Sequence, residues 1–290
     1  KGKAFYKLNK KNFNEVLGQL SNERSYYGFL SAHLVNKPLS INNIPYQASK
    51  NDLKNLSLRF EIKRIYELFI LGKKRAARKE LQYLMENSSD INFSSLSLLF
   101  HKWGWSDGVI LSYGRSKYFD HIEARFPILY EKYFDKYSKT NTEKSLLLGI
   151  ARKESIFVQY AKSSAGALGI MQVLPRTAYW VLKKSKMKKV SRNYLYNKNM
   201  NIYVGSYYFR YLYNKKKSYV EAIASYNAGP SIVRKWRKKN KASEDAWIEF
   251  IPYQETRNYT KLVIEYALVY DWVLNKKNTI RISKLIDINK

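Results

Sequence analysis

The stretch from Thr140 to Gln172 is the part of this sequence that says most about its fold. It begins Thr140-Asn141-Thr142-Glu143-Lys144-Ser145-Leu146-Leu147-Leu148-Gly149-Ile150-Ala151-Arg152-Lys153-Glu154-Ser155 and ends Gly169-Ile170-Met171-Gln172. Thr140 followed three residues later by Glu143 is the pattern of a capping box, which predicts a helix that begins here. The apolar residues Leu147, Ile150 and Ala151 recur at helical spacing, and Glu154 falls in register with them.

The position of Glu154 allows two interpretations. An acidic side chain at the end of an apolar stripe points toward the core, and a carboxylate moved out of water holds its proton more tightly. Such a group is suited to act as a general acid near neutral pH. The alternative is that Glu154 ends an ordinary helix and turns into solvent, and helical spacing alone does not separate the two.

The composition predicts a globular chain with room for two domains, because it has 290 residues of which 45% are hydrophobic. No apolar run reaches the roughly 18 residues that a membrane-spanning helix needs. The chain begins at Lys1 without a methionine, which leaves open a removed signal peptide or a longer N-terminus. There is no cysteine, and His33, His101 and His121 lack metal-ligand spacing, so we expect no metal site and no cofactor.

The formal net charge of +30 raises the question of a polyanionic partner. Lysine dominates over arginine and the charge is dispersed without a recognisable nucleic-acid motif, so nucleic acid is not expected, and an acidic cell-envelope polymer would be attracted equally well. We interpret most of the lysine runs as solvated loop edges; they are Lys183-Lys184, Lys188-Lys189, Lys215-Lys217 and Lys238-Lys239.

The first part of the chain, residues 1–139, has helical periodicity and predicts five to seven short helices up to about Lys136. Leu68-Phe69-Ile70-Leu71-Gly72 is echoed by Leu99-Phe100-His101-Lys102-Trp103-Gly104, a spacing close to that of helix-hairpin repeats. A short apolar helix is expected over residues 126–130. The polar residues 135–141 then place a domain boundary between 139 and 140.

The second part, residues 140–290, also predicts helices and no strand. Residues 161–169 form a small-residue loop that would let a ligand approach the backbone closely. Gly205, inside an expected helix, is explained if a neighbour packs against it. The remaining helices are expected near Leu174 to Lys184, from Asn201 to Leu212, from Tyr219 to Tyr226 with a stop at Gly229-Pro230, and through Trp272 at the end.

Four motifs occur in one order across this second part. They are Glu154-Ser155, Gly169-Ile170-Met171-Gln172, Ser225-Tyr226-Asn227-Ala228-Gly229-Pro230, and Ile251-Pro252 followed by Glu255-Thr256-Arg257 and Tyr259. Together they resemble the soluble lytic transglycosylase family of peptidoglycan-cleaving enzymes, densely over about residues 143–272. More faintly, residues 23–30 and 125–127 resemble the helical superhelix and linker that precede the catalytic domain in the long members.

The resemblance implies an all-α protein, with a superhelix-like and linker region over residues 1–139 and a lysozyme-like catalytic domain over 140–290. It implies the following roles: Glu154 as the single acid and base, Ser155 orienting Glu154 or the substrate's N-acetyl group, Met171 and Gln172 lining the glycan cleft, Tyr226 hydrogen-bonding near Glu154, Asn227 at the cleft wall, and Glu255 as a more distant substrate contact. The departures Lys153, Ile170 and Ser225 remove no reactive group.

The implied activity is cleavage of peptidoglycan strands between N-acetylmuramic acid and N-acetylglucosamine with formation of 1,6-anhydro products, in the periplasm or cell envelope. A hydrolase on the same fold, similar to goose-type lysozyme, is the nearest alternative, and it would need a second carboxylate such as Glu221, Glu249 or Glu255. A non-catalytic glycan-binding protein and a basic nucleic-acid-binding protein are the alternatives from other classes.

Overall fold

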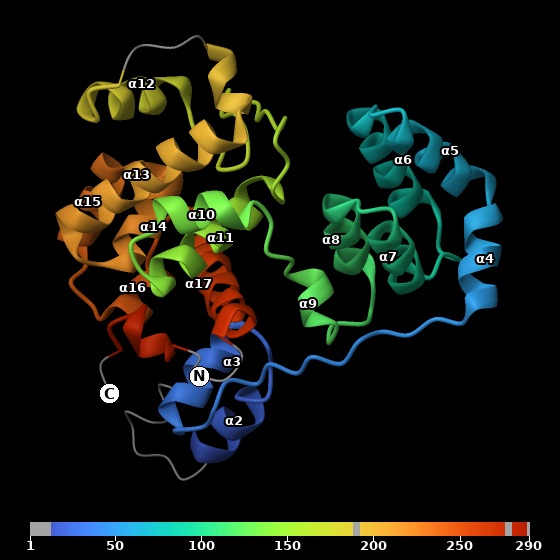
Figure 1. Cartoon of the computed structure of the whole chain (residues 1–290). Helices are drawn as coiled ribbons and strands as arrows, with labels where there is room; N and C mark the ends of the chain where they lie inside the picture. The colour runs from blue at the N-terminus through green and yellow to red at the C-terminus, as the bar shows by residue number, and fades with distance from the viewer. Residues whose placement is uncertain (1–12, 188–191, 276–279, 289–290) are drawn as a thin grey trace. The chain divides into compact units, whose positions relative to one another are not determined.

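The structure is a computed structural model that describes residues 13–187, 192–275 and 280–288. It is built from helices, which confirms the all-α prediction (Figure 1). Over these residues there is no β-strand, and the extended segments make two isolated antiparallel bridges, Lys162–Leu168 and Leu168–Val173. None of the described helices combines the length and the apolar character that crossing a membrane requires.

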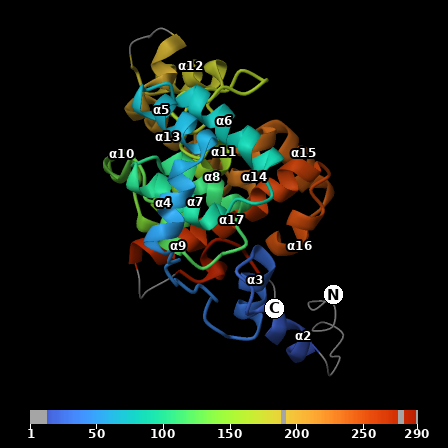
Figure 2. The same ribbon diagram turned by 90° about the vertical axis from the view of Figure 1, so that its right-hand side faces the viewer.

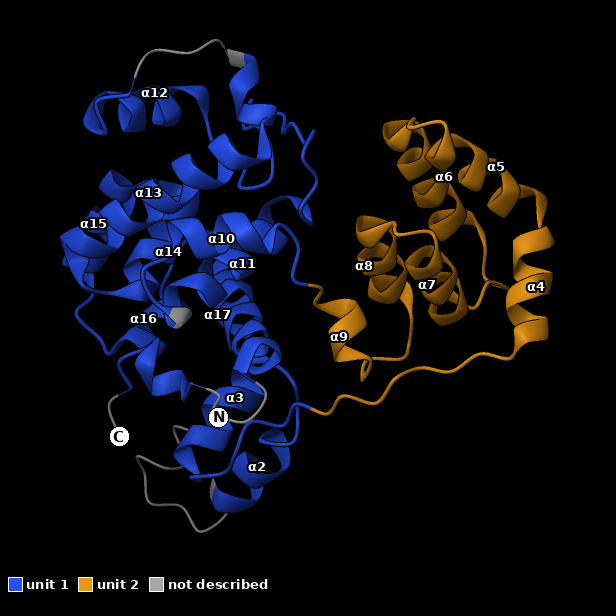
Figure 3. Cartoon of the chain, in the orientation of Figure 1, with its two compact units in different colours: residues 1–41, 128–290 blue, residues 42–127 orange. Residues whose placement is uncertain are grey.

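The chain divides into two compact units (Figure 3). Unit 1 contains residues 1–41 and 128–290, and unit 2 contains residues 42–127. This division differs from the expected boundary at 139/140, because the N-terminal helix α3 (Tyr26–Leu34) packs against the C-terminal helix α17 (Gln254–Asn275). The backbone N–H of Tyr26, in the first turn of α3, donates to the Glu265 carboxylate on α17 at 3.1 Å. The beginning and the end of the chain therefore belong to one folded unit.

Unit 2 is a stack of short helices with its own apolar core. Its two central hairpins carry the sequence echo. In each hairpin a glycine with positive φ follows the first helix, Gly72 at +70° and Gly104 at +72°. The same hydrogen bond closes both turns, from Lys73 N to Leu68 O at 2.9 Å and from Trp105 N to Phe100 O at 3.0 Å. The helices are α4 (Lys50–Leu58), α5 (Phe60–Ile70), α6 (Lys74–Asn87), α7 (Phe93–Lys102), α8 (Ser106–Arg115) and α9 (Ile122–Arg125).

The segment between the units differs from the sequence prediction. Residues 126–130 are not helical: α9 ends at Arg125 and α10 (Glu131–Tyr137) begins after them. Pro127 explains this, because proline disfavours helical conformation in the residue before it and cannot donate a backbone hydrogen bond. The described residues up to Tyr137 form nine helices, α2 (Phe13–Leu20) to α10, more than the five to seven expected.

Unit 1 is organised around two helices that lie side by side (Figures 1 and 2), α11 (Asn141–Ser155) and α17. Gly149 permits their close approach, since a Cβ there would lie 3.0 Å from the Val263 carbonyl oxygen on α17. Unit 1 also contains α2, α3 and α10. Its remaining helices are α12 (Pro175–Lys184), α13 (Lys198–Lys216), α14 (Tyr219–Ala228), α15 (Pro230–Lys239), α16 (Glu244–Glu249) and the short 3₁₀ helices η1 (Arg192–Tyr196) and η2 (Ile282–Lys284). Of these, α14 and α16 pack on α17, α13 and α15 pack on α14, and α12 packs on α13.

The described lysine runs are exposed and lie at the edges of loops, as expected, and each of them ends a helix. Lys183-Lys184, Lys215-Lys216 and Lys238-Lys239 occupy the last turns of α12, α13 and α15. A positive charge there interacts favourably with the negative end of the helix dipole, so these lysines have a local structural reason. Lys188-Lys189 lies outside the described residues.

Candidate active site

The helix that carries Glu154 begins and ends as a well-defined unit. The Thr140 hydroxyl accepts from Glu143 N at 3.0 Å, which is the first half of a capping box, and the Glu143 carboxylate reaches back past the N-cap to accept from Lys139 N at 2.7 Å. After Ser155 the chain leaves the helix through Ile156 and Phe157, which both have positive φ. Glu154 is thereby held in the last turn of α11, close to the loop that follows.

Glu154 has the environment of a general acid. Its Oε1 accepts a hydrogen bond from the Tyr259 hydroxyl at 2.6 Å, so the side chain faces α17 instead of turning into solvent. Burial raises the pKa of Glu154 from 4.5 to about 7, and the charge of Glu255 raises it further, while the Tyr259 hydrogen bond and the charge of Lys153 oppose the rise. A substantial fraction of Glu154 is therefore protonated at neutral pH, and its half-buried side chain lies against α17.

Tyr259, to which the sequence analysis gave no role, is part of the candidate site because its hydroxyl donates to Glu154. It is 3% exposed. Burial, together with the neighbouring charge of Glu154, raises the pKa of its hydroxyl well above the ordinary value, so it stays protonated and remains a donor. A sequence signal existed, because Glu255 and Tyr259 are four residues apart and so lie on one side of α17.

Ser155 does not hydrogen-bond to Glu154. Its hydroxyl donates to the carbonyl oxygen of Ile170 at 2.6 Å, fifteen residues along the chain. The resemblance implied that Ser155 orients Glu154 or the substrate. The geometry instead gives it the role of fastening the Gly-Ile-Met-Gln segment to the end of α11.

The side chain of Met171 packs in the core. Met171 is fully buried, and a Cβ at Gly205 on α13 would lie 2.5 Å from its sulfur. The close neighbour expected for Gly205 is therefore Met171, and this side chain does not line a cleft. Its backbone does serve the site, because its carbonyl oxygen accepts from the Tyr226 hydroxyl at 2.9 Å.

Asn201 is a second residue that the sequence reasoning missed. It is fully buried on α13, and its amide donates to the carbonyl oxygens of Leu168 and Leu195, both at 2.8 Å, and accepts from Met171 N at 2.8 Å. Asn201 thus holds the backbone on both sides of Gly169. The signal was a lone asparagine on the apolar face of a helix, which has to find buried hydrogen-bond partners.

Gln172 has an unusual backbone conformation for a residue other than glycine. Its φ is +45°, and its side-chain amide donates to the Gly169 carbonyl oxygen at 2.8 Å. Backbone strain of this kind costs about 1–3 kcal/mol and persists where the surroundings impose it. Here Asn201 and Ser155 hold the loop from either side, which presents Gln172, half-buried, at the surface.

The remaining predicted residues lie where α14 ends and α17 begins. The amide of Asn227 donates to Glu255 at 3.4 Å and accepts from the Thr256 hydroxyl at 2.7 Å. Burial raises the pKa of Tyr226, and the charge of Glu154 raises it further, so the two groups influence each other electrostatically. The structure therefore brings Glu154, Tyr226 and Tyr259 together, with Asn227 and Glu255 beside them.

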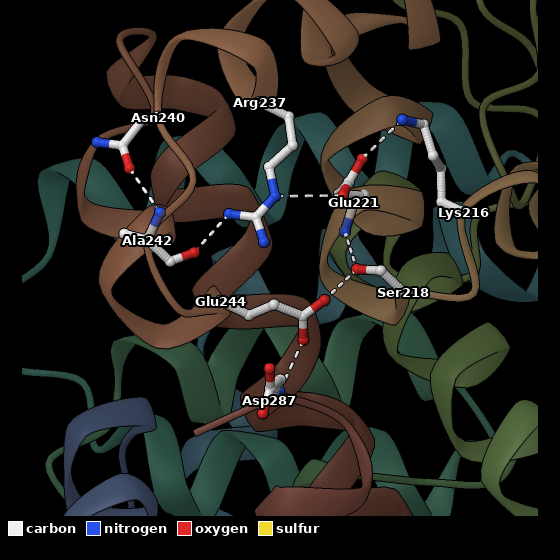
Figure 4. Close-up of polar contacts among 8 residues, drawn as sticks. All are labelled: Lys216, Ser218, Glu221, Arg237, Asn240, Ala242, Glu244 and Asp287. Atoms are coloured by element: carbon white, nitrogen blue, oxygen red, sulfur yellow. Dashed lines mark hydrogen bonds and ion pairs between the residues drawn. The ribbon is translucent and has the colours of Figure 1, made fainter. Parts of the chain in front are cut away.

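Other carboxylates of this unit are engaged elsewhere. Figure 4 shows Glu221 between Lys216 at 3.2 Å and Arg237 at 3.3 Å. Glu244 accepts from the Ser218 hydroxyl and from the backbone N–H of Asp287. These contacts tie α14, α15, α16 and the C-terminal segment together, so they give both carboxylates a structural function.

Glu249 is also paired, with Lys261 at 2.7 Å and with the Tyr27 hydroxyl at 3.0 Å. The residues considered as a second carboxylate are Glu221, Glu249 and Glu255. Of these three, Glu255 is the one whose charge raises the pKa of Glu154. Within the described ranges, no three His, Asp or Glu side chains gather so that they could hold a metal ion.

The fold and the site define an all-helical protein in which a glutamic acid with a raised pKa, Glu154, accepts a hydrogen bond from the hydroxyl of Tyr259. The chain belongs to the soluble lytic transglycosylase family. Residues 132–248 match the model of the transglycosylase SLT domain, and residues 57–122 match that of the soluble lytic murein transglycosylase L domain.

The relatives cover most of this chain. It is 31% identical over 273 residues to the soluble lytic murein transglycosylase of Escherichia coli K12, covering 92% of this chain and 42% of that protein. Among solved structures, an inactive mutant of the lytic transglycosylase Slt from Pseudomonas aeruginosa superposes with a TM-score of 0.89 at 29% identity, over 97% of this chain and 46% of that one.

The 70 kDa soluble lytic transglycosylase from E. coli superposes with a TM-score of 0.82 at 27% identity, over 94% of this chain and 45% of that one. The chain therefore spans slightly less than half the length of the relatives it matches.

We predict that Tyr226→Phe lowers turnover on peptidoglycan by ~10- to 1,000-fold, the scale of one positioned hydrogen bond near a reacting centre. The hydroxyl holds the Met171 carbonyl oxygen, while the ring still packs against Tyr208 at 5.7 Å between ring centres. Release of soluble fragments from purified sacculi, with a thermal melt of both proteins, measures the effect. An unchanged rate would reduce Tyr226 to a packing residue.

Proposed function

We propose that this protein is a lytic transglycosylase that cleaves the β-1,4 bond between N-acetylmuramic acid and N-acetylglucosamine in peptidoglycan. Its partners would be the glycan strands of the bacterial cell envelope. The observation that carries the proposal is the pairing of Glu154, whose pKa is about 7, with the Tyr259 hydroxyl at 2.6 Å. A carboxyl group that gains and loses its proton near neutral pH can serve as acid and then as base.

The first step uses the protonated form of Glu154. The carboxyl group donates its proton to the glycosidic oxygen, the bond to the muramic acid C1 breaks, and the sugar's own 2-acetamido group stabilises the positive charge left at C1. Glu154 becomes a carboxylate in this step. The Tyr259 hydroxyl, which donates to Oε1, stabilises the negative charge as it forms.

The second step uses the carboxylate. Glu154 takes the proton from the 6-hydroxyl of the same muramic acid, and that oxygen forms the new bond to C1, which closes a 1,6-anhydro ring. The attack is intramolecular, so the hydroxyl is already positioned and no water has to be activated. Glu154 ends the cycle protonated, as it began.

Hydrolysis by a second carboxylate is the other candidate, and Glu255 is the residue that would carry it. Glu255 is exposed and contacts Asn227. A nucleophile or a base for water would have to face the reacting sugar opposite the acid. We assign Glu255 to substrate binding because its one described hydrogen-bond partner is a neutral amide next to Tyr226, at the edge of the site.

The relatives agree with the proposed activity. Those named above are called lytic murein transglycosylases or lytic transglycosylases, and the P. aeruginosa structure is of a variant described as inactive after a Glu-to-Gln change. The direct test is incubation of purified sacculi with the protein and measurement of the soluble fragments. Tight binding to duplex DNA without any release of glycan would favour the nucleic-acid alternative instead.

The net charge of +30 should affect capture of the substrate more than chemistry. We predict that raising salt from about 50 to 500 mM lowers the rate on intact acidic sacculi several-fold, because the Debye length shortens from about 14 Å to about 4 Å. Cleavage of a short uncharged chitooligosaccharide, if it occurs, should hardly change. An equal loss on both substrates would mean that salt acts on the site itself.

A further inference from the structure

A pocket of about 390 Å³ lies in unit 1, and none of the residues that line it belongs to the four sequence motifs. One wall is formed by His33 and residues 36–39, where α3 ends, and the other by residues 280–282, which lead into η2. Pockets that bind small organic ligands have volumes of about 300–1,000 Å³. The pocket is therefore large enough for a molecule with a carbon skeleton and not only for a bare ion.

Both walls are fastened to α17. The backbone N–H of Tyr26 in α3 donates to Glu265 on α17 at 3.1 Å. The backbone N–H of Ile280 donates to Asp271, also on α17, at 2.7 Å. Helix α3 packs on η2 as well. Two segments from opposite ends of the chain are thus held together, so the pocket between them is part of the folded unit.

The pocket is separate from the candidate active site. Asp271, which holds Ile280, lies near the C-terminal end of α17, whereas Tyr259 lies near its N-terminal end. The two residues are twelve positions apart, which is about 18 Å along the helix axis. A small ligand in this pocket therefore does not contact Glu154, to which Tyr259 donates.

The two residues with a fixed charge that line the pocket, Lys37 and Arg281, are both basic. Both are exposed, and neither forms an ion pair with any residue that the structure describes. The carboxylate of Asp271 is fully buried behind the wall and accepts from Ile280 N at 2.7 Å and from the Asn275 amide at 3.0 Å. Two cations without a carboxylate partner at one pocket attract an anion.

The end of α3 offers little opposition to an anion. The last carbonyl oxygens of a helix carry partial negative charge when they lack partners. Here the turn that follows α3 supplies partners, because Asn36 N donates to the His33 carbonyl oxygen at 3.2 Å and Lys37 N donates to that of Ala32 at 2.7 Å. Asn36 adopts a φ of +56° to make this turn. The side chain of Lys37 therefore acts beside carbonyl groups that are already hydrogen-bonded.

We propose that this pocket binds a phosphate group carried on a small organic body. A phosphate monoester has nearly two negative charges at neutral pH, which match the two cations. The planar guanidinium of Arg281 donates two parallel hydrogen bonds to phosphate oxygens, and the ammonium of Lys37 adds a compact charge. The apolar residues of the lining, Leu39 and Ile282 among them, pack against the organic body. The proposal goes beyond the peptidoglycan site and stands or falls independently of it.

The test measures the binding of sn-glycerol 3-phosphate to the protein by isothermal titration calorimetry, in a chloride buffer of low ionic strength. We expect saturable binding at one site per chain. The double variant Lys37→Gln with Arg281→Gln should weaken it by about 10- to 100-fold, because it removes two charge-assisted contacts. Both side chains are exposed, so this variant should fold normally and release fragments from sacculi at the rate of the control.

The matched control is the double variant Lys238→Gln with Lys239→Gln. It removes the same two charges from exposed residues in the last turn of α15, which do not line the pocket. Its affinity for glycerol 3-phosphate should stay within about twofold of that of the unsubstituted protein, since distant charges are screened. Equal weakening in the two double variants would show that net charge alone attracts the phosphate, which would overturn the proposal. Absence of saturable binding by the unsubstituted protein would overturn it too.

Flotation with vesicles identifies where the phosphate comes from. Phosphatidylglycerol vesicles present the same phosphate as a lipid headgroup, and phosphatidylcholine vesicles are the neutral comparison. If the pocket variant floats less than the control variant with phosphatidylglycerol, the ligand is a lipid. If the two variants float equally and differ in the binding of glycerol 3-phosphate, the ligand is a free phosphate ester. Either result agrees with the proposal.

Discussion

We expect Glu154→Gln to abolish the lysis of sacculi, with a fall of ~1,000-fold or more, while the protein stays folded. The amide keeps the shape of the side chain and can still accept the Tyr259 hydrogen bond, but it has no proton to give to the glycosidic oxygen. In the proposed mechanism one carboxyl group serves in both steps, so its loss should remove both. Turbidity of a sacculus suspension measures the rate, and substantial residual lysis would remove Glu154 from its role.

The same variant makes a second measurement possible, on stability. The pKa of Glu154 is about 7 in the folded protein and 4.5 as the ordinary value. The unfolded chain therefore loses this proton at lower pH than the folded one, and Glu154 lowers the stability progressively as the pH rises from 4.5 to 7. Above about pH 7 that cost is constant, and below 4.5 it is absent.

The glutamine side chain of the variant does not ionise and so has no such cost. The thermal midpoint of the variant should therefore rise relative to that of the unsubstituted protein as the pH increases. We expect the two midpoints to be similar at about pH 4.5 and the variant to melt a few degrees higher at about pH 8. A difference that stays constant across this range would mean that Glu154 is not desolvated in the folded protein.

Tyr259→Phe should lower turnover by ~100-fold and also change its pH dependence. The first step needs protonated Glu154, so the rate falls as the pH rises through about 7. The Tyr259 hydrogen bond holds the pKa of Glu154 below the value that burial alone would give. Loss of this hydrogen bond should therefore raise the pKa of Glu154 and move the alkaline limb of the pH–rate profile to higher pH. The substitution also removes the donor that stabilises the Glu154 carboxylate formed in the first step, which explains the lower turnover.

Comparison with Tyr226→Phe distinguishes the effect of the Tyr259 hydrogen bond on Glu154 from a general effect of removing a tyrosine hydroxyl near the site. Tyr226 donates to the Met171 carbonyl oxygen and not to Glu154, so its loss should lower the rate with the alkaline limb near its original pH. Initial rates of fragment release across about pH 5 to 9 give both profiles. Identical limbs for Tyr259→Phe and the unsubstituted protein would contradict the assignment of Tyr259.

Several local patterns in the sequence predicted this structure correctly. The helix N-cap at Thr140, the start of α12 after Leu174 and the stop at Gly229 depend on residues within a few positions, and all three are present. The sequence could not show that Pro230 also opens a new helix, α15. A proline after a glycine ends one helix and suits the first position of the next equally well.

Long-range contacts determined what the sequence could not predict. Ser155 was expected near the substrate, yet its hydroxyl goes to Ile170, and Met171 turns into the core because Gly205 leaves room for it. Both outcomes depend on the loop being held from α13 by Asn201, thirty residues away. The placement of residues 1–41 with unit 1 depends on a contact between Tyr26 and Glu265, which no local pattern indicates.

The central claim is that a single carboxyl group closes the sugar ring without water, and the masses of the products test it most directly. Purified sacculi are digested to completion, and the soluble fragments are analysed by mass spectrometry. We expect 1,6-anhydromuropeptides, one water lighter than hydrolysis products and without a new reducing end. A Glu255→Gln protein should give the same products, at a reduced rate at most. Reducing muropeptides as the main product would contradict the account, and their loss in Glu255→Gln would identify Glu255 as the second carboxylate of a hydrolase.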